Sequence, residues 1–218
     1  MMTDSATPSA AYRMTSHEIL ALLAFEPGAG TALTRRVLGL AELADDHDLV
    51  RAGIGTLNIR DTVEVQGEEV ALLAEAKILA RIFATSSTWF DITRIGSAAF
   101  SPSYLVDSPA GRAAIFLRPL SEYLCLPLRD DVDLLDFVQT TVDGAVAAIS
   151  EEGGGIVSSR RYSAETAAPV VANIKVSEAG SLQLASAPLD ENGQLRVRDL
   201  DGGEQPGHVI RTLLAAAP

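Results

Sequence analysis

The chain is poor in the features that mark several protein classes. It contains one cysteine, so an internal disulfide framework is excluded. That residue, Cys125, lies in a run of apolar, strand-like residues, which predicts a buried side chain and not a nucleophile. No stretch approaches the ~18 uninterrupted apolar residues of a membrane-spanning helix. Even the apolar segment 137–149 is interrupted by Gln139 and Asp143.

Positive charge is also scarce. Lysine and arginine number 17 against 29 acidic residues, and the formal net charge is −12 at pH 7. Such a chain repels phosphate backbones and anionic lipid headgroups, so we expect neither nucleic acid nor a membrane surface as a partner. Residues 1–11 have neither the basic region nor the apolar core of a secretion signal, so we expect a cytoplasmic protein.

Motifs of catalytic and metal centres are missing from the sequence. It has no Gly-x-Ser-x-Gly nucleophile motif, and the glycines at 153–155 lack the ending of a phosphate-binding loop. Three histidines are too far apart for zinc-ligand spacing, namely His17, His47 and His208. The one dense carboxylate group is interpreted as the cap of a helix, and comprises Asp130, Asp131, Asp133 and Asp136. We therefore expect no catalytic residue, no cofactor and no metal.

The chain contains enough apolar residues to form a hydrophobic core. Hydrophobic residues make up 47% of the chain and charged residues 21%, which is typical of globular proteins. A chain of this length buries about 70% of the surface that its unfolded form exposes. Apolar residues have helical spacing in the first part of the chain and form strand-like runs afterwards, which predicts an α+β fold.

The N-terminal part is predicted to be a tail followed by helices. Residues 1–14 are small and polar and are predicted to be disordered. Thr15 and Glu18 have the spacing of a capping box, so the first helix is expected to begin there and to end before Pro27. A second, short helix is predicted from Thr31.

Residues 49–72 predict a helix that runs directly into a two-stranded hairpin around Gly67. Two glycines in that helix, Gly53 and Gly55, are interpreted as positions where another element packs closely. A further helix follows over residues 72–84. Together these elements predict a winged-helix-like module over residues 15–86.

Strand patterns dominate the middle of the chain. Short apolar runs joined by turns predict an antiparallel meander with strands at 89–95, 100–106, 113–117 and 123–126. A long amphipathic helix follows over 131–149. Residues 87–150 are therefore predicted to form an antiparallel sheet with one helix.

Residues 151–155, Glu-Glu-Gly-Gly-Gly, predict a hinge. Beyond it, strands are expected at 170–176, 181–185 and 195–200, followed by a helix from Pro206 to Leu214. Three residues before these strands are interpreted as a solvated strand start, namely Arg160, Arg161 and Tyr162. Residues 156–218 are thus predicted to form a second unit packed on the first, in a quasi-repeat of strands followed by one helix.

The run Arg51–Arg60, followed by a short hairpin, a helix and alternating strands through Leu128, resembles the N-terminal half of the EspG-type proteins of actinobacterial type VII secretion. This chain is shorter than those proteins and shows no clear match over its C-terminal part. The resemblance implies two related halves of sheet and helix. It also implies a cytosolic, non-enzymatic chaperone that binds a helical secretion substrate and covers its apolar tip.

Such a chaperone needs an exposed apolar surface. The candidates are Phe100 and Tyr104 in and after the serine-rich connection at 97–103, and Ile156 and Val157 beside the glycines. The alternative interpretation is that these four side chains belong to the core.

Two other functional classes remain open. An enzyme or small-ligand domain could assemble a site from dispersed residues, for which the candidates are Asp107, Arg112, Trp89 and Tyr123. A winged-helix DNA-binding regulator is the lesser alternative, because its recognition helix would begin with acidic residues where phosphate binding needs cations.

Overall fold

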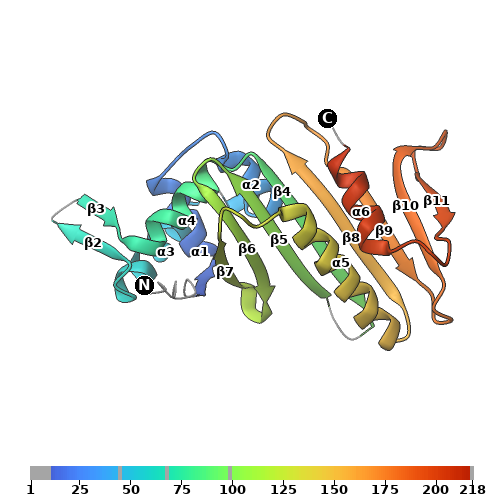
Figure 1. The fold of residues 1–218 in the computed structure, drawn as a ribbon. Coiled ribbons are helices and arrows are strands. Elements are labelled where there is room, and N and C mark those ends of the chain that lie inside the picture. Colours follow the sequence, from blue (N-terminus) through green and yellow to red (C-terminus); the bar gives the residue numbers. More distant parts are fainter. Residues whose placement is uncertain (1–10, 44–45, 67–68, 98–99, 217–218) are drawn as a thin grey trace, which may run out of the picture.

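The structure, a computed structural model, describes residues 11–43, 46–66, 69–97 and 100–216. Its main feature is one nine-stranded antiparallel sheet with helices on both faces (Figure 1), which confirms the predicted α+β class. In order across the sheet, the strands are β1 (Tyr12–Thr15), β7 (Glu122–Leu128), β6 (Gly111–Arg118), β5 (Phe100–Ser108), β4 (Thr88–Gly96), β8 (Gly155–Ser163), β9 (Val170–Val176), β10 (Leu182–Leu189) and β11 (Leu195–Asp199).

Six helices and one separate hairpin complete the described fold. The helices are α1 (Ser16–Phe25), α2 (Thr31–Val37), α3 (His47–Ile59), α4 (Ala74–Ala84), α5 (Leu134–Glu151) and α6 (Pro206–Ala215). The hairpin pairs β2 (Val63–Gln66) with β3 (Glu69–Leu72), so the predicted order of helix followed by wing is present in α3, β2 and β3. Gly67, placed between these strands by the sequence, lies outside the described residues.

The sheet has two halves that meet where β4 pairs with β8. The first half is β4–β7 followed by α5, and the second is β8–β11 followed by α6, so the same order of elements occurs twice. The β4–β8 pairing runs from Thr88 opposite Ser163 to Gly96 opposite Gly155. One continuous sheet therefore crosses the boundary predicted at 151–155.

The predicted hinge at 151–155 is a tight turn from α5 into β8. The amide of Gly154 donates to the carbonyl oxygen of Ile149, which closes the helix end. A Cβ placed on Gly155 would lie 2.4 Å from the Ile95 carbonyl oxygen, because the turn runs against the end of β4. Residues 151–155 thus form a hydrogen-bonded turn, in which Gly155 permits the close approach to β4.

Alternating residues of the strands face two separate cores. On β4, Trp89 faces α1–α4, whereas Phe90 faces α5 and α6. We call the two sides the α1–α4 face and the α5–α6 face. The α1–α4 core includes Ile19, Leu22, Leu79, Phe83, Val106, Ile115 and Cys125. The α5–α6 core includes Ile92, Leu105, Val138, Val142, Val157, Ile174, Ile210 and Leu214.

The N-terminal capping box is present and extends into the sheet. The backbone amide of Thr15 donates to Glu18 at 2.7 Å, and the Glu18 amide donates to the Thr15 hydroxyl. The fully buried Glu18 carboxylate also accepts from Arg60, at 2.9 Å. Just before the cap, β1 pairs with β7. The predicted disordered tail is therefore wrong for residues 12–14, and residues 1–10 lie outside the described residues.

Close helix packing explains one of the two glycines singled out in α3. A Cβ on Gly53 would lie 2.0 Å from the carbonyl oxygen of His17 in α1, so only glycine fits this crossing. Gly55 has no atom within 4 Å of such a Cβ. The close-packing interpretation is confirmed for Gly53 and wrong for Gly55.

The acidic residues before α5 cap that helix. The Asp133 side chain accepts from the amides of Leu135 and Asp136, as the sequence predicts for a helix start. Farther along α5, Asp143 accepts from the amide of Gly207 in the first turn of α6, at 2.8 Å. This contact fixes α6 beside α5.

Candidate functional site

Three apolar side chains form a row on the α1–α4 face. Ile95, near the end of β4, lies opposite Phe100 on β5 and opposite Ile156 on β8. The exposed fractions are 41% for Ile95, 69% for Phe100 and 38% for Ile156, and none of them belongs to either core. We call these three residues the apolar row. Two of the four residues predicted for partner binding therefore share one exposed surface.

The other two predicted contact residues lie elsewhere. Val157 points to the α5–α6 face and is fully buried, so its assignment to a partner surface is wrong. Alternation along β8 accounts for this, because consecutive residues of a strand point to opposite faces. Tyr104 lies on the same face as Phe100 but is half-buried against the α1–α4 core. For Tyr104 the core alternative fits better.

A buried polar cluster lies beside the apolar row, farther along the same strands. Asp91 is opposite both Tyr104 and Arg160 in the sheet and is only 6% exposed. Its carboxylate accepts from the Thr93 hydroxyl at 2.7 Å and pairs with Arg160 at 3.3 Å. Burial raises the pKa of Asp91, although Thr93 and Arg160 oppose this shift. Burial also raises the pKa of Tyr104, and the Asp91 charge adds to that rise.

Among the described residues, the helices of the α1–α4 face lie away from the strands beyond the apolar row, β10 and β11. The helices α1, α2 and α4 contact β1, β5, β6 and β8, and Figure 1 shows α1–α4 gathered well away from β10 and β11. Lys175 on β9 lies opposite Ile156 and is exposed, as is Val197 on β11. Exposed apolar side chains beside exposed polar ones are typical of protein interaction sites.

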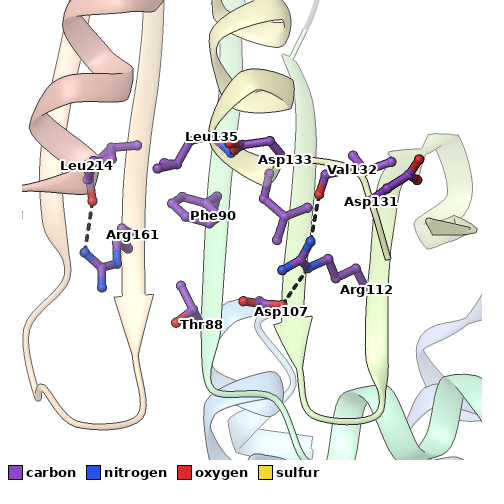
Figure 2. Close-up of a pocket in the computed structure, with 12 residues that line it drawn as sticks. Thr88, Phe90, Asp107, Arg112, Asp131, Val132, Asp133, Leu135, Arg161 and Leu214 are labelled. Carbon is purple, nitrogen blue, oxygen red and sulfur yellow. Dashed lines mark hydrogen bonds and ion pairs between the residues drawn. The ribbon is translucent and has the colours of Figure 1, made fainter. Parts of the chain in front are cut away.

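A cavity of about 480 Å³ lies on the opposite face, between the sheet, the start of α5 and the end of α6. Figure 2 shows Asp107 and Arg112 on one side of it and Arg161 on the other. The Asp107 carboxylate accepts from Arg112 Nε at 2.9 Å and raises the pKa of that guanidinium. Arg112 also donates to the Val132 carbonyl, and Arg161 donates to the Leu214 carbonyl.

These polar groups hold the protein's own segments together. Arg112 joins β5 and β6 to the segment before α5, and Arg161 joins β8 to the end of α6. The dispersed site predicted from Asp107, Arg112, Trp89 and Tyr123 does not assemble. Trp89 and Tyr123 are buried in the α1–α4 core, on the other side of the sheet.

Among the residues that the structure describes, no group of three or more histidine, cysteine or acidic side chains could hold a metal ion. Cys125 is fully buried, as the sequence predicts, and burial raises the pKa of its thiol to about 12. Within the described ranges, none of the helices is both long enough and apolar enough to cross a membrane.

Sequence reasoning missed Ile95 as a surface residue. Its strand was predicted at 89–95, but its exposure depends on the pairing of β4 with β8, which was not predicted. The sequence of this strand gives little signal, because after Ile156 and Val157 it continues with serine and arginine residues. Those polar residues were interpreted only as a strand start.

Comparisons with known proteins bear on the fold. A scan of known protein families and a search of curated proteins found no match to this chain. A search of solved structures matched it to the Mycobacterium tuberculosis type VII secretion system chaperone EspG5, solved in complex with a PE25–PPE41 dimer. The TM-score is 0.53 at 8% sequence identity, and the match covers 94% of this chain and 95% of that chain. The resemblance inferred from residues 51–128 is thus confirmed as a likeness of fold.

Proposed function

We propose that this protein is a non-enzymatic, cytoplasmic protein-binding module that serves as a chaperone or adaptor for a secreted helical partner. The observation that carries this proposal is the apolar row of Ile95, Phe100 and Ile156, exposed on one face of the sheet. Burying exposed apolar surface on association is favourable by about 25 cal/mol per Å², so a partner that covers the row gains stability.

The same order of strands followed by one helix occurs twice in this chain, and this repetition supports a helical partner. On the α1–α4 face, helices α1 and α4 pack on the first half of the sheet and α2 contacts β8, whereas these helices lie well away from β10 and β11 (Figure 1). A helix is the element that this same surface accepts from its own chain, so we infer that a partner presents a helix as well. The apolar tip of a helical pair would suit the short length of the row.

The structural neighbour supports a role in secretion. EspG5 is described as a type VII secretion system chaperone, and its structure contains a bound protein dimer. We infer that this chain acts in a related system of an actinobacterium. The acidic composition, with a net charge of −12, is consistent with a chaperone that neither nucleic acid nor a membrane attracts.

Site-specific photo-cross-linking tests the proposal. The photoreactive amino acid p-benzoylphenylalanine replaces Phe100 in the full chain, and the chain is irradiated in its cell of origin. We expect one dominant cross-linked polypeptide, identified by mass spectrometry, because position 100 lies in the interface.

The matched control carries the same photoreactive residue at Glu165, which is exposed in the loop after β8. Cross-linking at Glu165 but not at Phe100, or no adduct at Phe100 at all, would contradict the proposal.

A further inference from the structure

A groove runs along one side of α5 on the α5–α6 face. It consists of two adjoining cavities of about 460 and 190 Å³, which share Thr141. From Phe137 to Ala148 the groove follows α5 for about 17 Å, at a rise of 1.5 Å per residue. Figure 1 shows α6 on one side of α5, and the groove is lined from the sheet by residues of β4, β5 and β6.

The two ends of the groove differ in their lining. Phe116 on β6 and Phe137 on α5, both half-buried, form the apolar end. At the other end α5 presents the small residues Gly144 and Ala148, opposite Arg94 of β4, which pairs with Glu152 at 2.9 Å, and a Cβ on Gly144 would meet no atom within 4 Å. Small side chains on α5 therefore leave room for a helix to approach closely.

Negative charge lies at the apolar end. Asp133 and Asp136 belong to the lining, and their side chains are 54% and 65% exposed. They share one guanidinium, that of Arg211, at 4.0 and 2.8 Å. Because both carboxylates are more than half exposed, each can accept from a further cationic side chain.

The chain itself shows how α5 accepts such a helix. On the opposite side of α5, α6 places Ile210 and Leu214 in the core while Arg211 pairs with Asp136. An apolar stripe and a basic residue thus dock α6 against α5. The groove offers an apolar floor beside the same two carboxylates, which remain more than half exposed with Arg211 in contact.

We propose that this groove binds an amphipathic helix of a partner protein, about twelve residues long at 1.5 Å per residue. Large apolar side chains of that helix enter between Phe116 and Phe137, and a lysine or arginine lies beside Asp136. The inference does not rest on the apolar row, which lies on the other face of the sheet. A protein with both surfaces can hold two polypeptide segments at once.

The test uses two fluorescein-labelled synthetic helical peptides of fourteen residues. One has leucine at positions i, i+3, i+4 and i+7 with lysine elsewhere, and the other has glutamate in place of lysine. Fluorescence anisotropy measures their binding to the full chain. We expect the lysine peptide to bind at least about ten-fold more tightly than the glutamate peptide, because of the acidic rim.

Two matched variants locate the binding surface. Gly144→Leu fills the groove and is expected to weaken lysine-peptide binding at least about ten-fold. Ala147→Leu adds the same bulk on the exposed side of α5 and is expected to change binding by less than about two-fold. Circular dichroism checks that both variants fold, and Gly144→Leu should melt no lower than the parent because leucine favours helix over glycine.

Several outcomes would overturn the inference. Equal binding of the lysine peptide to both variants would show non-specific attraction to an acidic protein. Loss of peptide binding in Phe100→Ser would place the peptide on the apolar row. Self-association of the chain that Gly144→Leu abolishes, without peptide binding, would identify a second copy as the occupant, which analytical ultracentrifugation detects. A negative result here leaves the cross-linking experiment at Phe100 unaffected.

Discussion

The two halves of the sheet share one plan but differ in what covers the α1–α4 face. Over β4–β7, helices α1 and α4 bury Trp89, Val106 and Ile115 completely. Near the junction with β8, Ile95 and Ile156 remain exposed on the same face. The N-terminal helices thus cover only part of this face, and the apolar row on β4, β5 and β8 lies outside their cover. Stability is therefore expected to depend on the covered region, and partner binding on the open region, which is the apolar row.

The largest difference in stability between the two regions is expected when one aromatic side chain is removed from each. Trp89 is fully buried and stacks on Phe83 with ring centroids 6.0 Å apart, so Trp89→Ala should lower the free energy of unfolding by about 3–5 kcal/mol. Phe100→Ala, at the exposed end of the same face, should lower it by less than about 1 kcal/mol. Urea denaturation followed by circular dichroism measures both. Equal losses would show that Phe100 is part of the folded core.

The helical layer can be tested on its own through the two glycines of α3. Gly53→Ala forces a Cβ against the His17 backbone and should lower the free energy of unfolding by about 2–3 kcal/mol. Gly55→Ala meets open space and should raise it by about 0.5–1 kcal/mol, because alanine favours helix. Thermal denaturation of the two variants and the parent measures these changes in stability. A stable Gly53→Ala variant would mean that α1 and α3 do not cross as closely as described.

Replacing Asp91, which lies beside the apolar row on β4, is expected to change the stability by a smaller amount that depends on pH. Burial raises its pKa above the ordinary 3.8, so the folded chain holds this proton more tightly than the unfolded chain. As pH rises from 3.8 through the raised pKa, the parent should lose stability relative to Asp91→Asn. Denaturation of both chains at a series of pH values measures the difference. A difference that stays constant, or that changes in favour of the parent, would contradict the assignment.

The smallest expected effect concerns Cys125. Because burial raises the pKa of its thiol to about 12, almost no thiolate is present at pH 8 and a thiol reagent has no access. Reaction with dithionitrobenzoate should be slow in the folded chain and fast in urea. Rapid labelling without denaturant would show that the first half of the sheet opens readily.

Local patterns predicted most of the individual elements. The Thr15–Glu18 capping box, the cap at Asp133 and the long helix α5 follow from short-range spacing, and the structure contains all three. The α+β class followed from these elements. Such features depend on neighbouring residues only, so one sequence is sufficient to predict them.

The sequence did not predict β8 as a central strand of the sheet. For that reason it also did not predict that Ile95 and Ile156 lie side by side in the apolar row. Strand β8 carries polar residues in the middle of the sheet, and Ser158 and Ser159 are buried there although neither is apolar. The usual alternation of apolar and polar residues is therefore hidden. Pairing with β4, more than sixty residues away in the chain, brings Ile156 beside Ile95. Phe100 and Ile156 were predicted as surface residues, but their common row depends on this long-range contact.

The most direct test of the proposed function is the affinity of the polypeptide captured at position 100 for two variants of the full chain. Ile156→Ser removes the apolar side chain that β8 contributes to the row, and Ile59→Ser makes the same change at an exposed site at the end of α3. Calorimetric titration should show binding at least about ten-fold weaker for Ile156→Ser, with Ile59→Ser within about two-fold of the parent. Unchanged affinity in Ile156→Ser would contradict a partner seated on the apolar row.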